Sequence, residues 1–408
     1  MRTIIFIGTQ KSGSSREAIK TAANLGYYTV LFTNSIKQIQ QRSQYPDVHL
    51  MKLCNIDNAS EMKSIIENLV KRGLNIKGIV SFTDGSCYIA NILANEIGIN
   101  HFSVDAIKTM ENKIESRNAI STTIHCPKYL VINPNKEFLD NEIKEYLPAI
   151  LKSPTSAGSR DVYKILDYNE FIDKLSMLRK KFPFQNLILE EFLDGQQYIA
   201  EVLVINNVVN IIGIIEQEVS FINNRFIVTG YYLLTEKPDY YDSLYNAVST
   251  IINSHGMSTG ACHLELRYVN NVWKLIEINP RISGGGMKNL IELGTGINLV
   301  EQTLNIILKK DINIKPKFRK SVYAKYITSE EEGILEKVTG KNRCINSKDV
   351  LLVYIKPKKG NKLIRPLSMG ARYAYVIATG SNKSEAEDNA NNAIKELKFH
   401  LKNNKLIV

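Results

Sequence analysis

Two acidic residues, an amide and an arginine occur in an order that could bind a metal ion and stabilise negative charge. Glu265 lies in an alternating stretch, and the sequence EINPR follows as residues 277–281. Glu277 and Asn279 would supply a carboxylate and an amide oxygen, ligands that favour Mg²⁺ over Zn²⁺ or copper. Two carboxylates at close range repel each other unless a cation lies between them. The pattern predicts a magnesium site with Arg281 as a fixed cation beside it; the alternative is a solvated hairpin whose acidic residues serve solubility.

A β-hairpin over residues 263–278 would bring these groups together. Its two arms alternate between apolar and polar residues on either side of an Asn-Asn pair, which favours a tight turn. Antiparallel pairing then places Glu265 close to Glu277, and the two-residue period of a strand puts Asn279 on the same face as Glu277. The glycine run 284–286 that follows would let a ligand approach the backbone closely.

A second candidate site is a hydroxyl-rich loop, SPTSAGS at residues 153–159, which follows a short strand ending in Lys152. Its backbone N–H groups could cradle phosphate oxygens while Lys152 supplies charge, although many surface turns have the same composition. Residues 162–165 are expected to return from the loop as the second strand of a hairpin. Residues 187–207 pass from an apolar strand through a bend into another strand; the backbone exposed there could bind adenine, or the stretch is an ordinary buried strand and turn.

The rest of the sequence predicts the elements that must position these groups. Strands and helices alternate over roughly the first 100 residues, which predicts a doubly wound α/β domain with its ligand surface, Asp84 included, at the carboxyl ends of the strands. The loop after the first strand lacks both the GxGxxG spacing and the P-loop GK[ST], so neither standard nucleotide fingerprint applies. Helices are expected over about residues 105–120 and, near the end of the chain, over 383–401.

Composition limits the classes of protein. The 408 residues are too many for one core, and 44% hydrophobic with 23% charged residues is typical of a globular protein. No apolar run approaches the roughly 20 residues that span a bilayer, and the N-terminus has the pattern of a first strand rather than a signal peptide. Five scattered cysteines favour reduced thiols in a cytoplasm and give no zinc spacing.

The net charge of +11 raises the question of nucleic acid as a partner. The basic runs at residues 179–181, 309–320 and 356–362 lack the interleaved aromatic residues of a base-stacking surface. We therefore interpret the excess of lysine as solvated surface, with anionic phosphate ligands as the second explanation.

Taken in order, Lys113, Lys152 with its loop, the EEFLDG bend, Glu265 and the EINPR element resemble the ATP-grasp carboxylate–amine ligases, nearly end to end. NPRISGGGM and SGSSREAI look most like the bacterial L-amino-acid ligases that make dipeptides. The resemblance implies an ATP-grasp fold of the α/β class, with α+β character in the grasp portion. It implies an α/β pre-grasp domain in 1–105, an ATP-grasp domain in 106–310 with the ATP lid in 126–190, and a β-rich region with a closing helix in 311–408.

The resemblance also assigns roles to residues. Two Mg²⁺ ions, which Mn²⁺ could replace, would be held by Glu265, Glu277 and Asn279. ATP would contact Lys113, Lys152, Ser153, Ser156, Ala157, Gly158, Ser159, Glu190, Glu191, Phe192, Leu193 and Gln197, the last where many members have a ribose-binding glutamate. Arg281 would act in catalysis, and the amino-acid substrate would lie near Glu218, His263, Arg281, Gly284, Gly285 and Gly286.

The implied reaction joins two amino acids. A carboxylate attacks the γ-phosphate of ATP to give an acyl phosphate and ADP, and the amine of a second amino acid displaces phosphate. Glu218 would favour a basic first substrate such as arginine, unless it is simply a glutamate on an exposed strand; His263 could equally be structural. Two alternatives are a ligase that uses another amine or a carrier protein, and a non-catalytic nucleotide- or nucleic-acid-binding protein. The main interpretation implies free amino acids and ATP as partners, neither nucleic acid nor membrane, and by analogy a homodimer.

Overall fold

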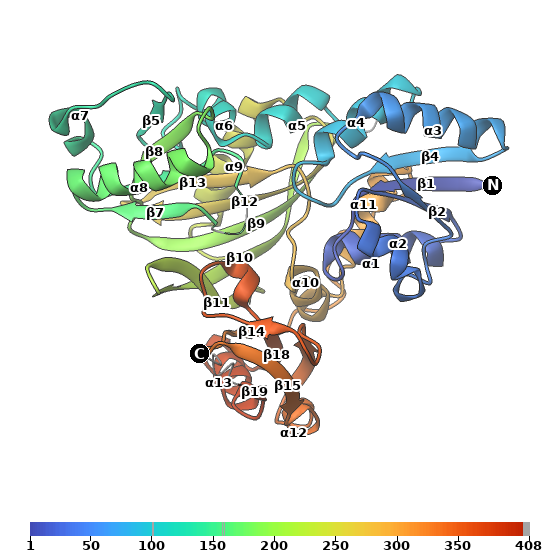
Figure 1. The fold of residues 1–408 in the computed structure, drawn as a ribbon. Helices are drawn as coiled ribbons and strands as arrows, with labels where there is room; N and C mark the ends of the chain where they lie inside the picture. The colour runs from blue at the N-terminus through green and yellow to red at the C-terminus, as the bar shows by residue number, and fades with distance from the viewer. Residues whose placement is uncertain (100–101, 157, 159, 403–408) are drawn as a thin grey trace, which may run out of the picture.

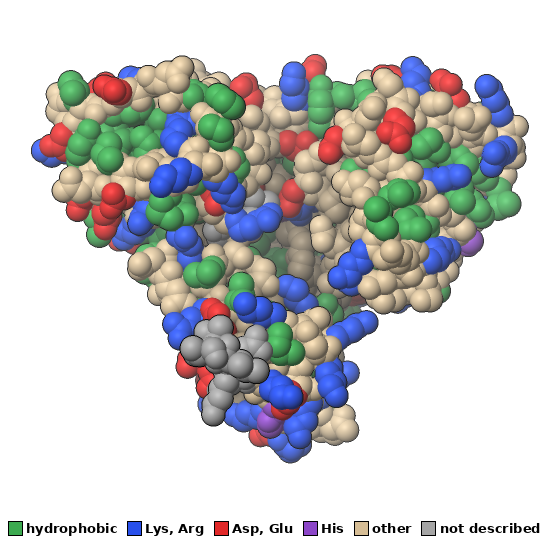
Figure 2. Space-filling model, in the orientation of Figure 1, with side chains coloured by type: hydrophobic (Ala, Val, Ile, Leu, Met, Phe, Trp, Pro, Cys, Tyr) green, Lys and Arg blue, Asp and Glu red, His purple; other side chains and the backbone are tan. Residues whose placement is uncertain are grey.

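The computed structural model describes residues 1–99, 102–156, 158 and 160–402, which form three lobes (Figure 1). The N-terminal lobe and a lobe containing two antiparallel sheets lie side by side, and the C-terminal lobe lies below them (Figure 1). Acidic and basic side chains meet in a hollow between the two upper lobes (Figure 2). None of the helices in the described residues has the length and apolar character that crossing a membrane requires.

The N-terminal lobe is the doubly wound domain that the sequence predicts. Its sheet has the order β3-β2-β1-β4 with all strands parallel. Residues 4–7 of the first strand are almost fully buried, as expected for a parallel sheet covered by helices on both faces. The elements are β1 (Arg2–Ile7), α1 (Ser14–Asn24), β2 (Tyr28–Thr33), α2 (Ile36–Gln40), the 3₁₀ helix η1 (Arg42–Gln44), β3 (Leu50–Leu53), α3 (Ala59–Lys71), β4 (Asn75–Val80) and α4 (Cys87–Glu96).

The helix expected over residues 105–120 is two helices, α5 (Val104–Met110) and α6 (Lys113–Ala119). Asn112 interrupts it, because the Asn112 side chain accepts hydrogen bonds from the backbone N–H groups of residues 114 and 115 and so caps α6. Lys113 is therefore the first residue of a new helix, where its side chain is buried and turned toward the centre of the molecule.

A four-stranded antiparallel sheet with the order β5-β8-β6-β7 is the smaller of the two antiparallel sheets in the lobe beside the N-terminal lobe. The pairing of β6 with β7 confirms the hairpin expected around the hydroxyl-rich loop. Its elements are β5 (Tyr129–Ile132), α7 (Asp140–Lys144), β6 (Ala149–Lys152), β7 (Val162–Ile165), α8 (Tyr168–Lys181) and β8 (Leu187–Glu191).

The central sheet has eight strands in the order β13-β12-β9-β10-β11-β14-β18-β16. Its last three strands come from the C-terminal lobe, so that lobe continues the central sheet through the pairing of β11 with β14. The sheet and its covering helices are β9 (Gln196–Ile205), β10 (Val208–Ile222), β11 (Arg225–Leu234), α9 (Tyr241–His255), β12 (Gly260–Val269), β13 (Val272–Asn279), α10 (Met287–Thr295), α11 (Leu299–Ile307), β14 (Ser321–Ile327), β16 (Val350–Ile355) and β18 (Ala374–Gly380).

The helix expected over 383–401 ends early, as α13 (Lys383–Ile394). Residues 398–402 form a strand instead, because they pair with a strand more than sixty residues earlier in the chain, a partner that local sequence does not reveal. The remaining elements of this lobe are β15 (Gly333–Thr339), α12 (Lys341–Ile345), β17 (Lys362–Leu363), the 3₁₀ helix η2 (Met369–Ala371) and β19 (Lys398–Lys402).

Candidate active site

The hairpin β12–β13 brings the two predicted carboxylates together. Glu265 pairs directly with Glu277 across the ladder. The turn residues Asn270 and Asn271 have φ of 49° and 62°, the left-handed values that a tight hairpin turn requires. The Asn279 amide donates a hydrogen bond of 3.2 Å to the Glu277 carboxylate. Both glutamates and Asn279 line one central cavity of about 330 Å³.

The electrostatics of this pair fit a divalent cation. Burial and the neighbouring Glu277 raise the pKa of Glu265 to about 7. Burial would raise the pKa of Glu277 too, but Lys113 and Lys152 lower it, with Lys113 Nζ 3.3 Å from the carboxylate. No three His, Cys, Asp or Glu side chains gather as a metal cluster in the described part of the chain, so the donor set is two carboxylates and an amide. Oxygen donors that repel each other match the ligand preference of Mg²⁺.

Lys152 and Glu190, both expected to contact ATP, form a buried ion pair with each other. Lys152 Nζ lies 2.5 Å from Glu190, and the other Glu190 oxygen lies 2.8 Å from Nε of Arg117, which is fully buried. Burial opposes the charge of Glu190, but Arg117 and Lys152 hold its pKa below the ordinary value. Burial lowers the pKa of Lys152. The carboxylate of Glu190 therefore orients Lys152, while the adenine hinge, expected mainly from the backbone of residues 190–193, stays a prediction.

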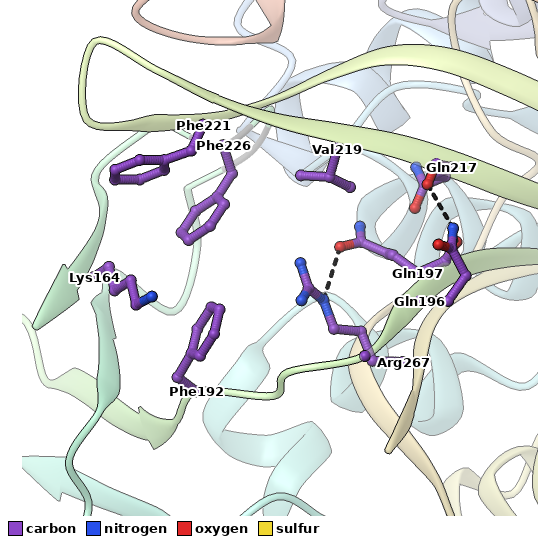
Figure 3. Close-up of a pocket in the computed structure, with 10 residues that line it drawn as sticks. Lys164, Phe192, Gln196, Gln197, Gln217, Val219, Phe221, Phe226 and Arg267 are labelled. Carbon is purple, nitrogen blue, oxygen red and sulfur yellow. Dashed lines mark hydrogen bonds between the residues drawn. The ribbon is translucent and has the colours of Figure 1, made fainter. Parts of the chain in front are cut away.

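The bend after β8 is held by an arginine that the sequence analysis missed. Arg267 donates hydrogen bonds to the Leu193 carbonyl, at 2.7 Å, and to the Gln197 side chain, at 3.1 Å (Figure 3). The Gln197 amide in turn donates to Glu265 at 3.3 Å. Gln197 therefore links the bend to the carboxylate pair. The signal for Arg267 was its place two residues after Glu265, since alternate strand residues share a face.

An aromatic side cavity of about 340 Å³ adjoins this bend. The rings of Phe192 and Phe226 are stacked with centroids 6.0 Å apart, and Phe221 lies beside Phe226 (Figure 3). Lys164 Nζ lies 4.0 Å from the centroid of the Phe192 ring. The side cavity shares Phe192, Gln197, Val219, Phe226 and Arg267 with the central cavity, so the two cavities adjoin.

Ser156 and Gly158 of the hydroxyl-rich loop line the central cavity. Lys113 Nζ donates to the Ser156 carbonyl at 3.0 Å, and the Gly158 carbonyl accepts a hydrogen bond from the backbone of Met369 in the C-terminal lobe. Ser153 points elsewhere, because its hydroxyl donates to Gln185. Ala157 and Ser159 lie outside the described residues. The loop thus contacts both a predicted phosphate-binding lysine and the C-terminal lobe.

Arg281 connects the hairpin to the N-terminal lobe. Its guanidinium donates to Asp84, in the loop after β4, with Nε 2.7 Å from the carboxylate. The Arg281 carbonyl lies 2.8 Å from Nδ1 of His263. Burial and the nearby Arg281 lower the pKa of His263 to about 4, so this imidazole is neutral at neutral pH. Arg281 and Asp84 both line the central cavity, as does His263.

Glu218 was expected to line the substrate pocket, and the structure corrects that expectation. Its neighbour Val219 lines the central cavity and Glu218 does not. The Glu218 carboxylate accepts hydrogen bonds from Tyr323 and, at 2.8 Å, from Lys325, both on β14. Glu218 is therefore engaged in joining β10 to the C-terminal lobe.

The glycine run divides between the cavity and a contact with the C-terminal lobe. Gly284 and Gly285 line the central cavity. Gly286 does not: its N–H donates to the Tyr326 hydroxyl, and a Cβ at this position would lie 2.8 Å from the same oxygen. Of the predicted residues, the cavity brings together Lys113, Lys152, Ser156, Gly158, Glu190, Glu191, Phe192, Leu193, Gln197, His263, Glu265, Glu277, Asn279, Arg281, Gly284 and Gly285.

A second arginine missed from the sequence, Arg372, lines the cavity from the C-terminal lobe. It follows η2 and lies between two tyrosines, with its guanidinium carbon 4.2 Å from the Tyr326 ring centroid and 5.6 Å from that of Tyr231. Nothing in the local sequence distinguishes it from the many surface arginines and lysines of this lobe.

Two protein-family models match the chain. A model described as an ATP-grasp domain matches residues 145–289, and one described as L-amino acid ligase C-terminal domain 2 matches residues 325–402.

Three similar proteins share about a fifth of their residues with this chain. An L-arginine-specific L-amino acid ligase of Bacillus subtilis is 22% identical over 65% of this chain and 66% of that protein. An uncharacterized protein of Sinorhizobium fredii, y4rH, is 21% identical over 81% of this chain and 69% of that protein. The crystal structure of an L-amino acid ligase from Bacillus licheniformis shares the fold, with a TM-score of 0.83 at 17% identity over 99% of both chains. The chain is an ATP-grasp protein with an L-amino acid ligase C-terminal domain, because residues 145–289 match the first model and residues 325–402 match the second.

Proposed function

We propose that this protein is an ATP-dependent L-amino-acid ligase that joins two free amino acids into a dipeptide, releasing ADP and phosphate. The observation that carries the proposal is the pair Glu265–Glu277 with Asn279, facing the same cavity as Lys113, Lys152 and Arg281. A protein that only binds a ligand would not need both oxygen ligands for a metal ion and several cationic side chains around one cavity. Phosphoryl transfer does need them, because its catalysis is mostly positioning and charge neutralisation.

The nucleotide would occupy the space between the bend and the carboxylate pair. The flat, aromatic side cavity beside Leu193 and Phe192 suits an adenine ring, with Arg267 and Gln197 near the ribose. Lys113 and Lys152 would then approach the phosphates, Lys152 oriented by Glu190 and Arg117 as in the structure.

Members of the family use ATP with Mg²⁺, and here Glu265, Glu277 and Asn279 would hold two ions. When bound, the metal neutralises phosphate charge. The chain's own residues do the rest. Arg281 would bind the first substrate's carboxylate and stabilise the charge that develops on the transferring phosphoryl group. The carboxylate oxygen forms a bond to the γ-phosphorus as the bond to ADP breaks. The second amine, having lost its proton to solvent, then attacks the acyl carbon, and phosphate leaves with the bonding electrons.

The identity of the first amino acid is a separate part of the proposal. Arginine is the first candidate to test, because one relative is an L-arginine-specific ligase. The acidic partner expected for arginine, Glu218, is occupied by Lys325, so an arginine preference would need a different residue. The homodimer stays a prediction that analytical ultracentrifugation would test.

The experiment is a substrate screen of the purified protein with ATP and Mg²⁺. Amino acids are offered singly and in pairs, ADP is measured, and the products are identified by mass spectrometry. We expect ADP and a dipeptide in equal amounts with at least one pair. Glu236→Ala, an exposed glutamate outside the cavity, is the matched control for Glu277→Ala. ADP release that depends on a carrier protein or a non-amino-acid amine, without any dipeptide, would overturn the proposal.

A further inference from the structure

Arg372 is a cation of the central cavity that forms no ion pair with an acidic side chain in the described part of the chain. Its Nη1 donates to the Val228 carbonyl at 3.1 Å and to the Tyr231 hydroxyl at 2.7 Å, and its Nε donates to the Met369 carbonyl at 3.3 Å. All of these acceptors are neutral. Within residues 1–99, 102–156, 158 and 160–402, no aspartate or glutamate forms an ion pair with Arg372, and its Nη2 has no hydrogen-bond partner.

The surroundings hold this guanidinium in a fixed place. Tyr326 lies against one face at 4.2 Å, and the Tyr326 hydroxyl accepts the N–H of Gly286 at the end of the glycine run. Met369, the first residue of η2, donates its backbone N–H to the Gly158 carbonyl in the hydroxyl-rich loop. Arg372 therefore lies between the glycine run 284–286, the loop that contains Gly158 and β11, with its Nε and Nη1 already engaged. Its Nη2 is left to donate a charge-assisted hydrogen bond to a carboxylate oxygen in the cavity.

Three of the four other lysines and arginines of the cavity have acidic partners, and the fourth, Arg267, is held at the bend by the Leu193 carbonyl and the Gln197 side chain. Arg281 pairs with Asp84, Lys152 with Glu190, and Lys113 lies 3.3 Å from Glu277. These three stand where the proposed phosphates, metal and first carboxylate would lie. Arg372 comes from a different lobe and lies between Tyr231 and Tyr326, with its charge close enough to Glu265 to offset part of the rise in pKa that burial gives that carboxyl.

The chemistry of the proposed reaction leaves one carboxylate in need of a partner. The first amino acid loses its free carboxylate when the acyl phosphate forms, whereas the second amino acid keeps its carboxylate throughout and carries it into the dipeptide. We propose that Arg372 binds this retained carboxylate of the acceptor, so that the acceptor must be an amine bearing a carboxylate rather than a simple amine. The inference rests on the proposed function and adds the residue that recognises its second substrate.

The test compares three acceptors with a first amino acid that the wild-type protein activates. They are the preferred second amino acid, its α-amide, which lacks the charge, and hydroxylamine, which traps the acyl phosphate as a hydroxamate without needing a carboxylate site. We expect the wild-type protein to prefer the amino acid to its amide by about 10- to 100-fold in kcat/KM, the size of effect that a charge-assisted hydrogen bond gives.

Arg372→Gln should remove this preference. It should lower kcat/KM for the amino-acid acceptor by a similar factor, chiefly through KM, and leave the amide and hydroxamate rates close to wild type. Arg372→Lys, which keeps the charge, should retain most of the preference, and so serves where the glutamine variant does not fold. Arg365→Gln, an exposed arginine of the same lobe, is the matched control and should behave as wild type.

Three results would overturn the inference. The first is a wild-type protein that uses the amide as well as the acid, which requires no variant. The second is an Arg372→Gln protein that loses hydroxamate formation as strongly as dipeptide formation, since that would place Arg372 on the transferring phosphate or in the fold alone. The third is a wild-type protein that forms neither hydroxamate nor dipeptide with any amino acid. Only this third result would also remove the proposed ligase function, so the two failures are distinguishable.

Discussion

Glu201 provides a stability prediction whose size follows from the structure. It lies in the middle of the central sheet, is 0% exposed, and its carboxylate accepts hydrogen bonds of 3.1 and 3.3 Å from the N–H of Ser283, next to the glycine run. Burial raises the pKa of Glu201 from its ordinary 4.5 to about 7. A pKa difference of that size between the folded and unfolded states changes the free energy of unfolding by about 3 kcal/mol, at about 1.4 kcal/mol per pKa unit.

The direction of the pH effect follows from proton counting. Between pH 4.5 and 7 the unfolded chain releases the Glu201 proton while the folded chain keeps it. The free energy of unfolding therefore falls as the pH rises through this window, and the full loss is reached above pH 7. Glu201→Gln cannot ionise and still offers an oxygen to Ser283. It should remove about 3 kcal/mol of the decrease in unfolding free energy between pH 4.5 and pH 8, and should be the more stable protein at pH 8.

Urea unfolding followed by tryptophan fluorescence measures this effect. Trp273 is the only tryptophan of the chain, is buried, and lies on β13 in the same sheet as Glu201. Glu216→Gln is the matched control, because Glu216 lies on the neighbouring strand β10 but is partly exposed and paired with Lys383. An unchanged pH dependence in Glu201→Gln, equal to that of wild type and of the control, would refute the reasoning.

Three further predictions concern the cavity itself. Glu277→Ala should abolish ADP formation with amino acids while leaving the circular dichroism spectrum unchanged; residual turnover near the wild-type rate would argue against a metal ligand. Arg281→Ala should lower kcat by more than it weakens ATP binding, because its contribution is to charge that develops in the transition state; equal losses in both would count against that role. Glu190→Gln should lower the unfolding free energy by about 3–5 kcal/mol, because it leaves Arg117 and Lys152 buried without their shared carboxylate; a smaller loss in urea unfolding would show that this ion pair is not needed for stability.

The parts of the site that lie close together in sequence could be predicted from it. The pairing of Glu265 with Glu277 was predictable because one short turn fixes the register of a hairpin, and the Asn-Asn pair specifies that turn. The hairpin around the hydroxyl-rich loop was predictable for the same reason. Alternating strands and helices likewise predicted the parallel sheet of the N-terminal lobe.

The parts that depend on distant partners could not be predicted in this way. Strand alternation indicates that Glu218 and Val219 face opposite sides of a sheet, but not that β14, from more than a hundred residues later, supplies Lys325 to Glu218. Glu190 was assigned to the adenine bend, because the sequence gives no sign that Arg117 lies beneath it. Strand alternation places Arg267 on the face of Glu265, whereas no local pattern marks Arg372, which reaches the cavity only through the assembled sheet.

Each of the two helices whose predicted length was wrong is ended by a competing interaction, one local and one with a distant strand. The first helix stops near residue 112 because the Asn112 side chain accepts hydrogen bonds from the backbone N–H groups of residues 114 and 115. These bonds start a new helix at that point. The last helix gives way to β19 because a strand partner for residues 398–402 is available in the folded lobe.

The most direct test of the central claim is the binding of Mn²⁺ with ATP, followed by the electron paramagnetic resonance signal of the free ion. Mn²⁺ takes the same oxygen ligands as Mg²⁺, and its binding is measured without turnover. Wild-type protein and the Glu236→Ala control should bind the ion in the presence of ATP, whereas Glu265→Gln and Glu277→Ala should bind it at least about 10-fold more weakly, a loss that even outer-shell partners of a metal can produce. Equal Mn²⁺ affinity in all four proteins would contradict the account.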